Sequence, residues 1–323
     1  MNAIQVAAYG SPDMLALAEL DDPVPGDSEV LIDVAAASVN PIDWKIISGA
    51  MKAFIPLPLP FTPGVDAAGT VIAVGRNVTT LAPGDEVMGF IGIVGAFATR
   101  AVVDAARLAR KPASLGFLEA AAIPAASLTA WQALHEYGAL QAGQTVLIHA
   151  AAGGVGSVAV QLAKLAGAHV TATASARNRD YVQSLGATDV IDYTQEDFAA
   201  RTSKFDVVLD LVGGDTQARS WSVLKPGGTL VSTVSKPDSV LGNDVGATGK
   251  NFATRADAAL LTALAALYGS GQLGTHIDSV FPFPKASHAL ARSMSGHVRG
   301  KVILDMGAYR SSGPEADRRR ERK

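Results

Sequence analysis

Two patterns of apolar and polar positions divide this chain near residue 116. Before that point, short apolar runs separated by Pro and Gly lie at 29–34, 69–74 and 85–90, among others. Runs with this spacing predict a compact β barrel or sandwich. From about residue 117 onward, strand-like and helix-like runs alternate, which predicts a doubly wound parallel sheet and an α/β fold class.

The elements expected in the second half follow the order that such a sheet requires. Strands are expected at 145–149, 169–174, 190–193, 205–210 and 229–233, and helices at 155–166, 179–185 and 256–268. The strand at 205–210 is almost continuously apolar, as expected for a strand covered on both faces. Residues 235–252 are Gly-rich and weakly patterned, so we expect a surface loop there, and a last strand is expected at 300–304.

The most informative segment is 147–163, where an apolar strand, a glycine-rich turn and an apolar-striped helix follow one another. Relative to the pattern Gly-x-Gly-x-x-Gly, Ala151 occupies the first glycine position, and Gly153 and Gly156 occupy the second and third. Such a turn lets backbone N–H groups at a helix N-terminus approach a pyrophosphate closely. The motif by itself is also compatible with a tight connection that binds nothing.

The segment after the second strand of this half bears on cofactor choice. A site for NAD usually has Asp or Glu at this point, to bind the ribose. Here the chain has Ser175 and Arg177, with no carboxylate until Asp180. A carboxylate would repel a 2′-phosphate, whereas Arg binds phosphate through two charge-assisted hydrogen bonds. The sequence therefore favours NADPH, the alternative being that the arginines belong to a solvated loop.

Composition narrows the class of protein. The chain has 323 residues, which is long enough for two domains. Of these residues 48% are hydrophobic and 18% are charged, as expected of a globular protein. It has no cysteine, which excludes disulfides, cysteine-ligated zinc and a thiol nucleophile. The net charge of −3 argues against general nucleic-acid binding. No signal-like N-terminus or membrane-length apolar run is visible, so we expect a cytoplasmic protein.

Six motifs, in order along the chain, carry a resemblance to a known family. They are Ser-Val-Asn-Pro-Ile-Asp-Trp-Lys at 38–45, Pro-Gly-Val-Asp-Ala-Ala-Gly-Thr-Val at 63–71, Gly-Asp-Glu-Val at 84–87, Ala-Ala-Ala-Gly-Gly-Val-Gly at 150–156, Leu-Gly-Ala at 185–187 and Gly-Lys-Val-Ile-Leu at 300–304. Over nearly all of 1–306 the chain resembles the medium-chain dehydrogenases/reductases. More narrowly, it is similar to the zinc-independent quinone oxidoreductases and enone reductases.

The resemblance implies a GroES-like β-rich domain and a Rossmann domain. We expect the first to span 1–116 and to be completed by 282–310, and the second to span 117–281. Residues 311–323 are polar and arginine-rich and are expected to form a disordered tail. Family members are commonly dimers joined through the sheet edges of their Rossmann domains, and 277–283 is a candidate edge strand there, so we expect a homodimer.

Departures from the zinc-dependent relatives concern the metal site. Those relatives carry an early Cys and a Gly-His-Glu segment, whereas here Asn40 to Asp43 occupy the region of the Cys and Gly-Val-Asp stands at 64–66. No His occurs in the first 130 residues. Because catalytic zinc needs about three converging ligands, we expect no metal.

Loss of a Lewis acid favours conjugated acceptors, because nothing would hold the alkoxide of a simple alcohol. Hydride transfer to an enone or a quinone delocalises charge onto oxygen and requires mainly orientation and a few hydrogen-bond donors. We therefore predict NADPH-dependent reduction of a quinone or an α,β-unsaturated carbonyl. An enoyl-thioester reductase and a non-catalytic NADPH-binding sensor remain alternatives, and RNA binding is disfavoured by the acidic net charge.

The resemblance also assigns roles in cofactor binding. It implies that Gly153, Gly154, Val155 and Gly156 hold the pyrophosphate, Ser175 and Arg177 the 2′-phosphate, Tyr193 the adenosine end and Thr129 the nicotinamide. Tyr193 is otherwise an ordinary strand tyrosine, and Thr129 a plain helix-surface residue. Lys301 is expected either to approach the cofactor phosphates or to be a solvated lysine at a strand edge.

Catalytic candidates lie in the motif at 38–45. Asn40 and Asp43 occupy positions that line the active site in the zinc-free relatives. Asn40 would hydrogen-bond the substrate oxygen or the nicotinamide ribose, or would only cap the turn before Pro41. Some relatives carry a tyrosine a few residues later, but here Trp44 and Lys45 fill that region. Lys45 is thus a candidate donor, although exposed lysines are common.

Overall fold

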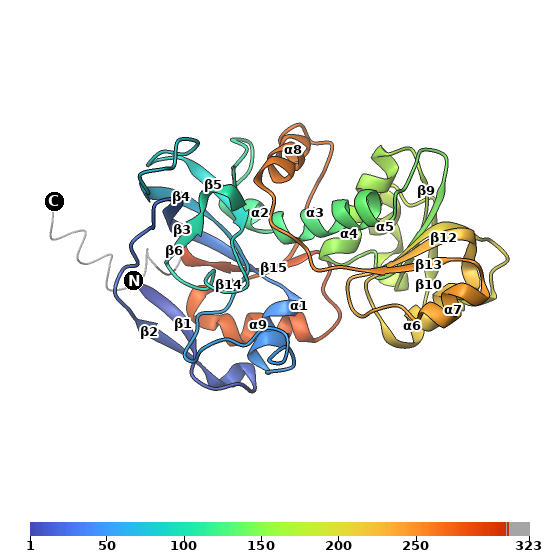
Figure 1. Ribbon diagram of the computed structural model, residues 1–323, viewed down its shortest axis with the longest axis horizontal. Helices are drawn as coiled ribbons and strands as arrows, with labels where there is room; N and C mark the ends of the chain where they lie inside the picture. Colours follow the sequence, from blue (N-terminus) through green and yellow to red (C-terminus); the bar gives the residue numbers. More distant parts are fainter. Residues whose placement is uncertain (308, 310–323) are drawn as a thin grey trace. The chain divides into compact units, whose positions relative to one another are not determined.

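The structure is a computed structural model that describes residues 1–307 and residue 309. It divides into two units (Figure 1): unit 1 comprises residues 1–125 and the segment from Ala256 onward, and unit 2 comprises 126–255. The division differs from the expected boundaries at 116 and 281. Helix α2 (Phe117–Ala121) packs on β3 and β4 of unit 1, and α8 (Ala258–Gly269) packs on β7 of unit 1. The expected tail at 311–323 lies outside the described residues.

Unit 1 is built around a mixed sheet. In the described residues its path is β14 (Ile277–Pro282), β15 (Lys301–Asp305), β3 (Glu29–Val39), β4 (Asp66–Val74), β5 (Glu86–Phe90) and β7 (Leu108–Arg110), with β6 (Arg100–Asp104) paired to β3. All pairs are antiparallel except β14 with β15. A separate antiparallel pair is formed by β1 (Asn2–Val6) and β2 (Leu15–Glu19). These elements confirm the β-rich first half.

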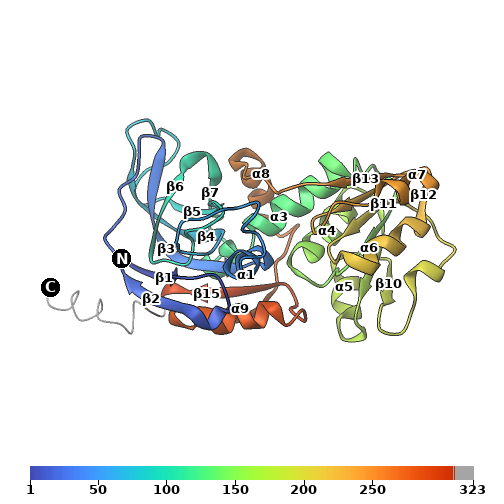
Figure 2. The ribbon, with the colours of Figure 1, turned by 60° about the horizontal axis from the view of Figure 1, so that its bottom comes forward.

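Two helices contribute to the apolar core of unit 1. Helix α1 (Pro41–Ile47) and helix α9 (Ala286–Met294) contact each other, and α9 also lies along β15 (Figure 2). Their buried residues Ile47 and Leu290 belong to the same hydrophobic cluster as Val34 of β3 and Phe97. The core therefore joins the N-terminal motif that contains α1 to the last helix of the chain.

The candidate edge strand is in a different sheet from the one expected. We expected it at an edge of the nucleotide-binding sheet, but β14 lies at the edge of the sheet in unit 1, parallel to β15. The reason is its place in the chain: it lies only one helix before β15, and the short segment returns both strands to unit 1 together. The dimer argument based on this strand is therefore not supported.

Unit 2 contains the expected parallel sheet. Its order is β10 (Asp189–Asp192), β9 (His169–Ala174), β8 (Thr145–Ile148), β11 (Phe205–Asp210), β12 (Leu224–Ser232) and β13 (Thr248–Asn251). The connecting helices include α4 (Gly154–Leu165), α5 (Arg179–Leu185) and α6 (Gly214–Ser220), and α3 (Pro124–Trp131) precedes the sheet and continues as a π-helical turn, Gln132–Tyr137. Strand order reverses between β8 and β11, where doubly wound sheets bind nucleotides.

The loop expected at 235–252 is only partly a loop. It contains helix α7 (Ser239–Asp244), capped by the Asp238 side chain, and strand β13, which pairs with β12 over four residues. The sequence Thr-Gly-Lys-Asn of β13 has no apolar alternation, because an edge strand of this kind is held by backbone hydrogen bonds rather than by a buried side-chain face. No helix in the described chain is both long and apolar enough to cross a membrane.

Candidate active site

Three neighbouring strands of unit 1 bring polar side chains to one end of the sheet. Because the start of β15 pairs with the end of β3, Lys301 meets Asn40, the residue that follows β3. Ser38 of β3 pairs with Asp66, the first residue of β4. We call Ser38, Asn40, Asp66 and Lys301 the polar cluster. All four are buried: none is more than 8% exposed.

Hydrogen bonds connect every member of the polar cluster. The Lys301 ammonium donates to Oδ1 of Asn40 at 2.6 Å and lies 3.5 Å from Oδ2 of Asp66. The Asn40 amide donates to the same Asp66 oxygen at 3.0 Å, and the Ser38 hydroxyl donates to it at 2.8 Å. The other Asp66 oxygen accepts from the backbone N–H of Ala125 at 2.9 Å. Hydrogen bonds that satisfy both charged groups in this way offset the free-energy cost of burying an ion pair.

Asp43 lies behind the polar cluster in the first turn of α1. Its Oδ2 accepts the backbone N–H of Asn40 at 2.7 Å, so Asp43 fixes the start of the helix. Burial, reinforced by the nearby Asp66 charge, raises the pKa of Asp43 to about 8. Burial also lowers the pKa of Lys301, although the two carboxyl groups partly oppose this effect.

The candidate site residues of unit 1 lie in different environments. Asn40 is the N-cap residue of α1, before Pro41, and its amide also belongs to the polar cluster. Lys301 is not the solvated strand-edge lysine of the alternative interpretation, since it is 5% exposed. Lys45 is half-buried, with Nζ 5.6 Å from the centre of the Trp44 ring. The part played by Asp66 was missed, because its hydrogen-bond partners come from segments that lie far apart in the sequence.

The glycine turn of unit 2 joins β8 to α4. Gly153 is the N-cap residue of α4 in an extended conformation, and no side chain caps the helix. A Cβ on Gly153 would meet only the Ala150 carbonyl oxygen at 3.4 Å, so space is open beside it. A Cβ on Gly156 would lie 2.4 Å from that same oxygen, so glycine is required for close packing. Uncapped N–H groups beside open space fit a pyrophosphate.

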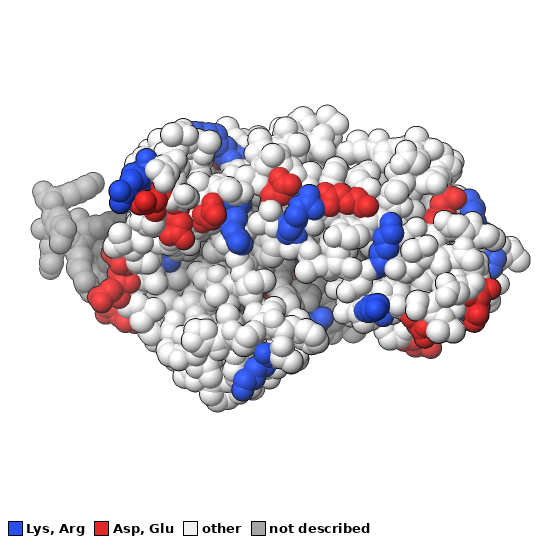
Figure 3. Space-filling view, in the orientation of Figure 1, with Lys and Arg blue, Asp and Glu red and all other residues white. Residues whose placement is uncertain are grey.

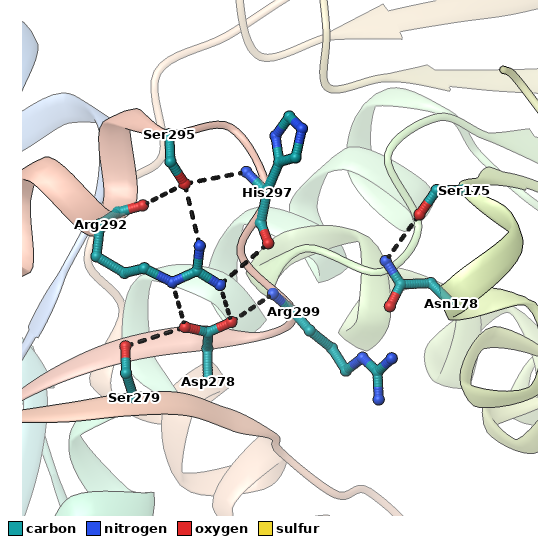
Figure 4. Close-up of polar contacts among 8 residues, drawn as sticks. All are labelled: Ser175, Asn178, Asp278, Ser279, Arg292, Ser295, His297 and Arg299. Atoms are coloured by element: carbon teal, nitrogen blue, oxygen red, sulfur yellow. Dashed lines mark hydrogen bonds and ion pairs between the residues drawn. The ribbon is translucent and has the colours of Figure 1, made fainter.

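The residues expected at the 2′-phosphate lie in the turn after β9. Ser175 precedes this turn, and its hydroxyl accepts from the Asn178 amide at 3.3 Å (Figure 4), while Arg177 is exposed. Tyr193, directly after β10, is 57% exposed, as expected of a residue available to a ligand. The nearby Asp192 is opposite Ala174 in the sheet, but its carboxylate is bound by the Thr194 hydroxyl at 2.8 Å.

Two further polar residues of unit 2 are buried. Thr129 of α3 is 8% exposed, and its hydroxyl lies 2.7 Å from that of Thr254, so it is not an ordinary helix-surface residue. His149, directly after β8, lies 3.2 Å from the Thr173 hydroxyl and 3.0 Å from that of Ser220. Burial lowers the pKa of His149 to about 4, which keeps the ring neutral at neutral pH.

A bidentate ion pair supports the segment that leads into Lys301. The Arg292 guanidinium donates to the two carboxylate oxygens of Asp278 at 2.7 and 2.6 Å (Figure 4). Asp278 also accepts the backbone N–H of Arg299 at 3.1 Å, and Arg292 donates to the carbonyl of His297. These contacts fix the residues just before β15. No group of three or more His, Cys, Asp or Glu residues positioned to hold a metal occurs in the described part of the chain.

The fold and these sites define a class of nicotinamide-nucleotide oxidoreductase, and comparison with known proteins agrees. The family model for the alcohol dehydrogenase GroES-like domain matches 26–113, and the one described as zinc-binding dehydrogenase matches 185–304. A chloroplastic quinone-oxidoreductase, QR1, of Triphysaria versicolor is 35% identical, covering 94% of this chain and 98% of the relative. The chloroplastic NADPH-dependent alkenal/one oxidoreductase of Arabidopsis thaliana is 35% identical, covering 94% and 79%.

Solved structures extend the same result. The quinone oxidoreductase from Coxiella burnetii superposes with a TM-score of 0.86 at 34% identity, covering 95% of this chain and 99% of that one. The Escherichia coli quinone oxidoreductase complexed with NADPH gives 0.87 at 29%, covering 94% and 100%. The chain belongs to the medium-chain dehydrogenase/reductase superfamily and, within it, to the zinc-independent quinone oxidoreductase branch. The resemblance and the fold class predicted from the motifs are confirmed.

Proposed function

We propose that this protein is an NADPH-dependent oxidoreductase that transfers hydride to a quinone or an α,β-unsaturated carbonyl without zinc. The observation that carries the proposal is the glycine turn, where Gly156 permits close packing, space is open beside Gly153 and no side chain caps α4. The printed names of its relatives support the acceptor class, since they include quinone oxidoreductases and an alkenal/one oxidoreductase. A mycobacterial neighbour complexed with NADPH supports the cofactor.

Cofactor binding is assigned to unit 2. The backbone of Gly153, Gly154, Val155 and Gly156 would hold the pyrophosphate, with Ser175 and Arg177 at the 2′-phosphate, Tyr193 at the adenosine and Thr129 at the nicotinamide. Bound NADPH supplies a hydride. The exposure of Arg177 and Tyr193 supports these roles, because both side chains are accessible to a ligand.

Substrate binding is assigned to unit 1, around Asn40, Asp43 and Lys45. Asp43 stays largely protonated at neutral pH, because its pKa is raised to about 8. It therefore adds little negative charge beside a substrate oxygen that becomes anionic during reduction. Lys45, half-buried against Trp44, is a candidate donor to the acceptor.

We also propose that the protein acts as a cytoplasmic homodimer on small molecules. Relatives with chloroplastic and mitochondrial names show that the location varies within the family. On the face drawn in Figure 3, acidic and basic side chains are interspersed, which does not favour a strongly charged partner such as a nucleic acid. Light scattering on the purified protein would measure the oligomeric state.

The proposed activity is tested by following loss of NADPH and of NADH with 1,2-naphthoquinone, 1,4-benzoquinone, a 2-alkenal and an enoyl-CoA. We expect NADPH to be consumed faster than NADH, with a quinone or the alkenal as acceptor. Preference for the enoyl-CoA would identify an enoyl-thioester reductase instead. NADPH binding without turnover of any acceptor would identify a non-catalytic sensor.

A further inference from the structure

The hydrogen-bonding capacity of Asn40 is already used within unit 1. A carboxamide has one carbonyl acceptor and two N–H donors. The carbonyl accepts from Lys301, and the N–H groups donate to Oδ2 of Asp66 at 3.0 Å and to the carbonyl of Ser38 at 3.3 Å. Asn40 thus has no donor left over for a substrate oxygen. A different group must supply that hydrogen bond.

Lys301 has the donor that Asn40 lacks. An ammonium group carries three N–H donors, and the described residues offer it two acceptors, on Asn40 and on Asp66. The second of these contacts, at 3.5 Å, is long. Its positive charge is balanced by Asp66, while Asp43 is largely neutral at neutral pH. Lys301 therefore has one N–H group with no acceptor among the described residues. This group is buried and its charge is balanced, and electrostatic interactions in such a setting are stronger than in water.

The backbone holds Lys301 in a defined position. Gly300 has a φ of +73°, and a Cβ there would lie 2.0 Å from the carbonyl oxygen of His276. That same carbonyl accepts the backbone N–H of Lys301 at 2.9 Å. Together with the ion pair between Arg292 and Asp278, this contact fixes the start of β15. A preorganised donor is what stabilisation of a developing oxyanion requires.

We propose that Lys301 donates a hydrogen bond to the carbonyl oxygen of the substrate and delivers the proton that completes its reduction, with Asn40 and Asp66 as positioning residues. This inference rests on the proposed function. When hydride forms the new C–H bond at the β-carbon of an enone, the C=C electron pair shifts and the negative charge moves to oxygen. The N–H bond of Lys301 then breaks, its proton goes to that oxygen, and the resulting enol converts to the ketone. Solvent reprotonates the amine.

A quinone requires the same proton transfer. Hydride transfer produces the hydroquinone monoanion, and the Lys301 proton neutralises its oxygen. Burial lowers the pKa of Lys301, and a lowered pKa makes the ammonium group a stronger acid.

A binding experiment without cofactor tests Lys301 directly. The probe is 4-nitrophenol, whose anion resembles an enolate or a hydroquinone anion and absorbs visible light. We expect the wild type to bind the anion in preference to the neutral phenol, and Lys301→Met to lose at least about tenfold in affinity for the anion, the loss of one charged hydrogen bond. The exposed Lys285→Met should match the wild type. Equal binding of the anion by Lys301→Met, or no preference in the wild type, would overturn the assignment.

Kinetics supply a second readout. In Lys301→Met we expect kcat to fall about 10²–10⁴-fold, the usual contribution of general acid catalysis. We also expect kcat of the wild type to decline at high pH and kcat of the variant not to do so. Lys301→Arg should restore anion binding more than turnover, because Arg does not release its proton. An unchanged pH profile in Lys301→Met would contradict the proposal.

Folding and the proposed function are controlled separately. Lys301→Met leaves the Asp66 charge buried without its partner, so the double variant Lys301→Met/Asp66→Asn, which keeps the cluster neutral, is measured beside it. Thermal unfolding of each variant tests whether it is folded. If the wild type reduces no acceptor, the proposed function fails, and the 4-nitrophenol result still decides the role of Lys301.

Discussion

Lys301 and Asn40 are separated by 261 positions, yet the ammonium nitrogen of one lies 2.6 Å from the amide oxygen of the other. The contact joins the two chain segments of unit 1 across the pairing of β15 with β3. Because both side chains are buried, loss of either one leaves a polar partner that water cannot easily satisfy. The polar cluster therefore contributes to stability as well as to the proposed chemistry.

Replacing Asn40 tests this contribution to stability. Asn40→Ala removes an acceptor from Lys301 and a donor from Asp66, and we expect the free energy of unfolding to fall by about 1–3 kcal/mol. Urea denaturation measures it. The exposed Asn77→Ala is the matched control and should change the value by less than about 0.5 kcal/mol. A loss no larger than that of the control would show that the cluster does not stabilise unit 1.

The raised pKa of Asp43 predicts an unusual dependence of the free energy of unfolding on pH. Its pKa rises from an ordinary value of 3.8 to about 8 on folding, so the folded state binds more protons between those values. The contribution of Asp43 to the free energy of unfolding therefore decreases as pH rises through that window, by at most about 1.4 kcal/mol per pH unit.

Asp43→Asn imitates the protonated form and should remove this dependence. Urea denaturation at about pH 5 and about pH 8 should show a wild type that loses stability relative to the variant as pH rises. The exposed Asp21→Asn should follow the wild type. Parallel curves for the wild type and Asp43→Asn would mean that Asp43 is not neutral in the fold.

Arg177 is expected to distinguish the two nicotinamide cofactors. In Arg177→Ala, we expect NADPH affinity to fall about 10- to 100-fold through loss of charge-assisted hydrogen bonds, with NADH affinity unchanged. Titration calorimetry measures both. Arg179→Ala is the control, since the Arg179 guanidinium is paired with Glu196 at 3.4 Å. Equal losses for both cofactors in Arg177→Ala would refute a 2′-phosphate site.

The glycine turn provides a matched pair of substitutions. Gly156→Ala brings a Cβ to 2.4 Å from the Ala150 carbonyl oxygen, so the helix must move, and we expect both stability and NADPH affinity to fall. The cost in stability should be about 1–3 kcal/mol, as for other overpacked sites.

Gly153→Ala makes only an ordinary contact at 3.4 Å. It should leave thermal unfolding of the free protein nearly unchanged and still weaken NADPH, because its methyl group fills the space for the ligand. Tight NADPH binding by Gly153→Ala would show that the pyrophosphate lies elsewhere.

Much of the fold is predictable from sequence because its signals are local. The run of apolar residues in β11 and the glycine turn before α4 each fall within one short window, and both were placed correctly. Strand β13 was missed because its Thr-Gly-Lys-Asn sequence has no apolar face, and an edge strand depends on the backbone of its neighbour. Local patterning also cannot show which sheet receives β14, since its partner β15 lies beyond another helix.

The candidate site was predictable in part. Asn40 and Asp43 stand together in one motif and are both buried in the structure. Their catalytic roles remain predictions, as do the roles assigned to the residues of the glycine turn. The setting of Lys301 could not be foreseen, because lysine is rarely buried and its two partners come from a segment at the other end of the sequence. Asp66 entered the sequence analysis only as part of the Gly-Val-Asp segment that replaces Gly-His-Glu, since no local pattern shows that it accepts from Ser38 and Asn40.

The order of the two units along the chain has a consequence for biosynthesis. Unit 2 is continuous from 126 to 255, whereas unit 1 needs β15, which is made later. Domains fold as units while the ribosome extends the chain. A nascent polypeptide can therefore complete unit 2, to which cofactor binding is assigned by proposal, before the segment that bears Lys301 has emerged, so the proposed proton donor is the last part of the enzyme to be made.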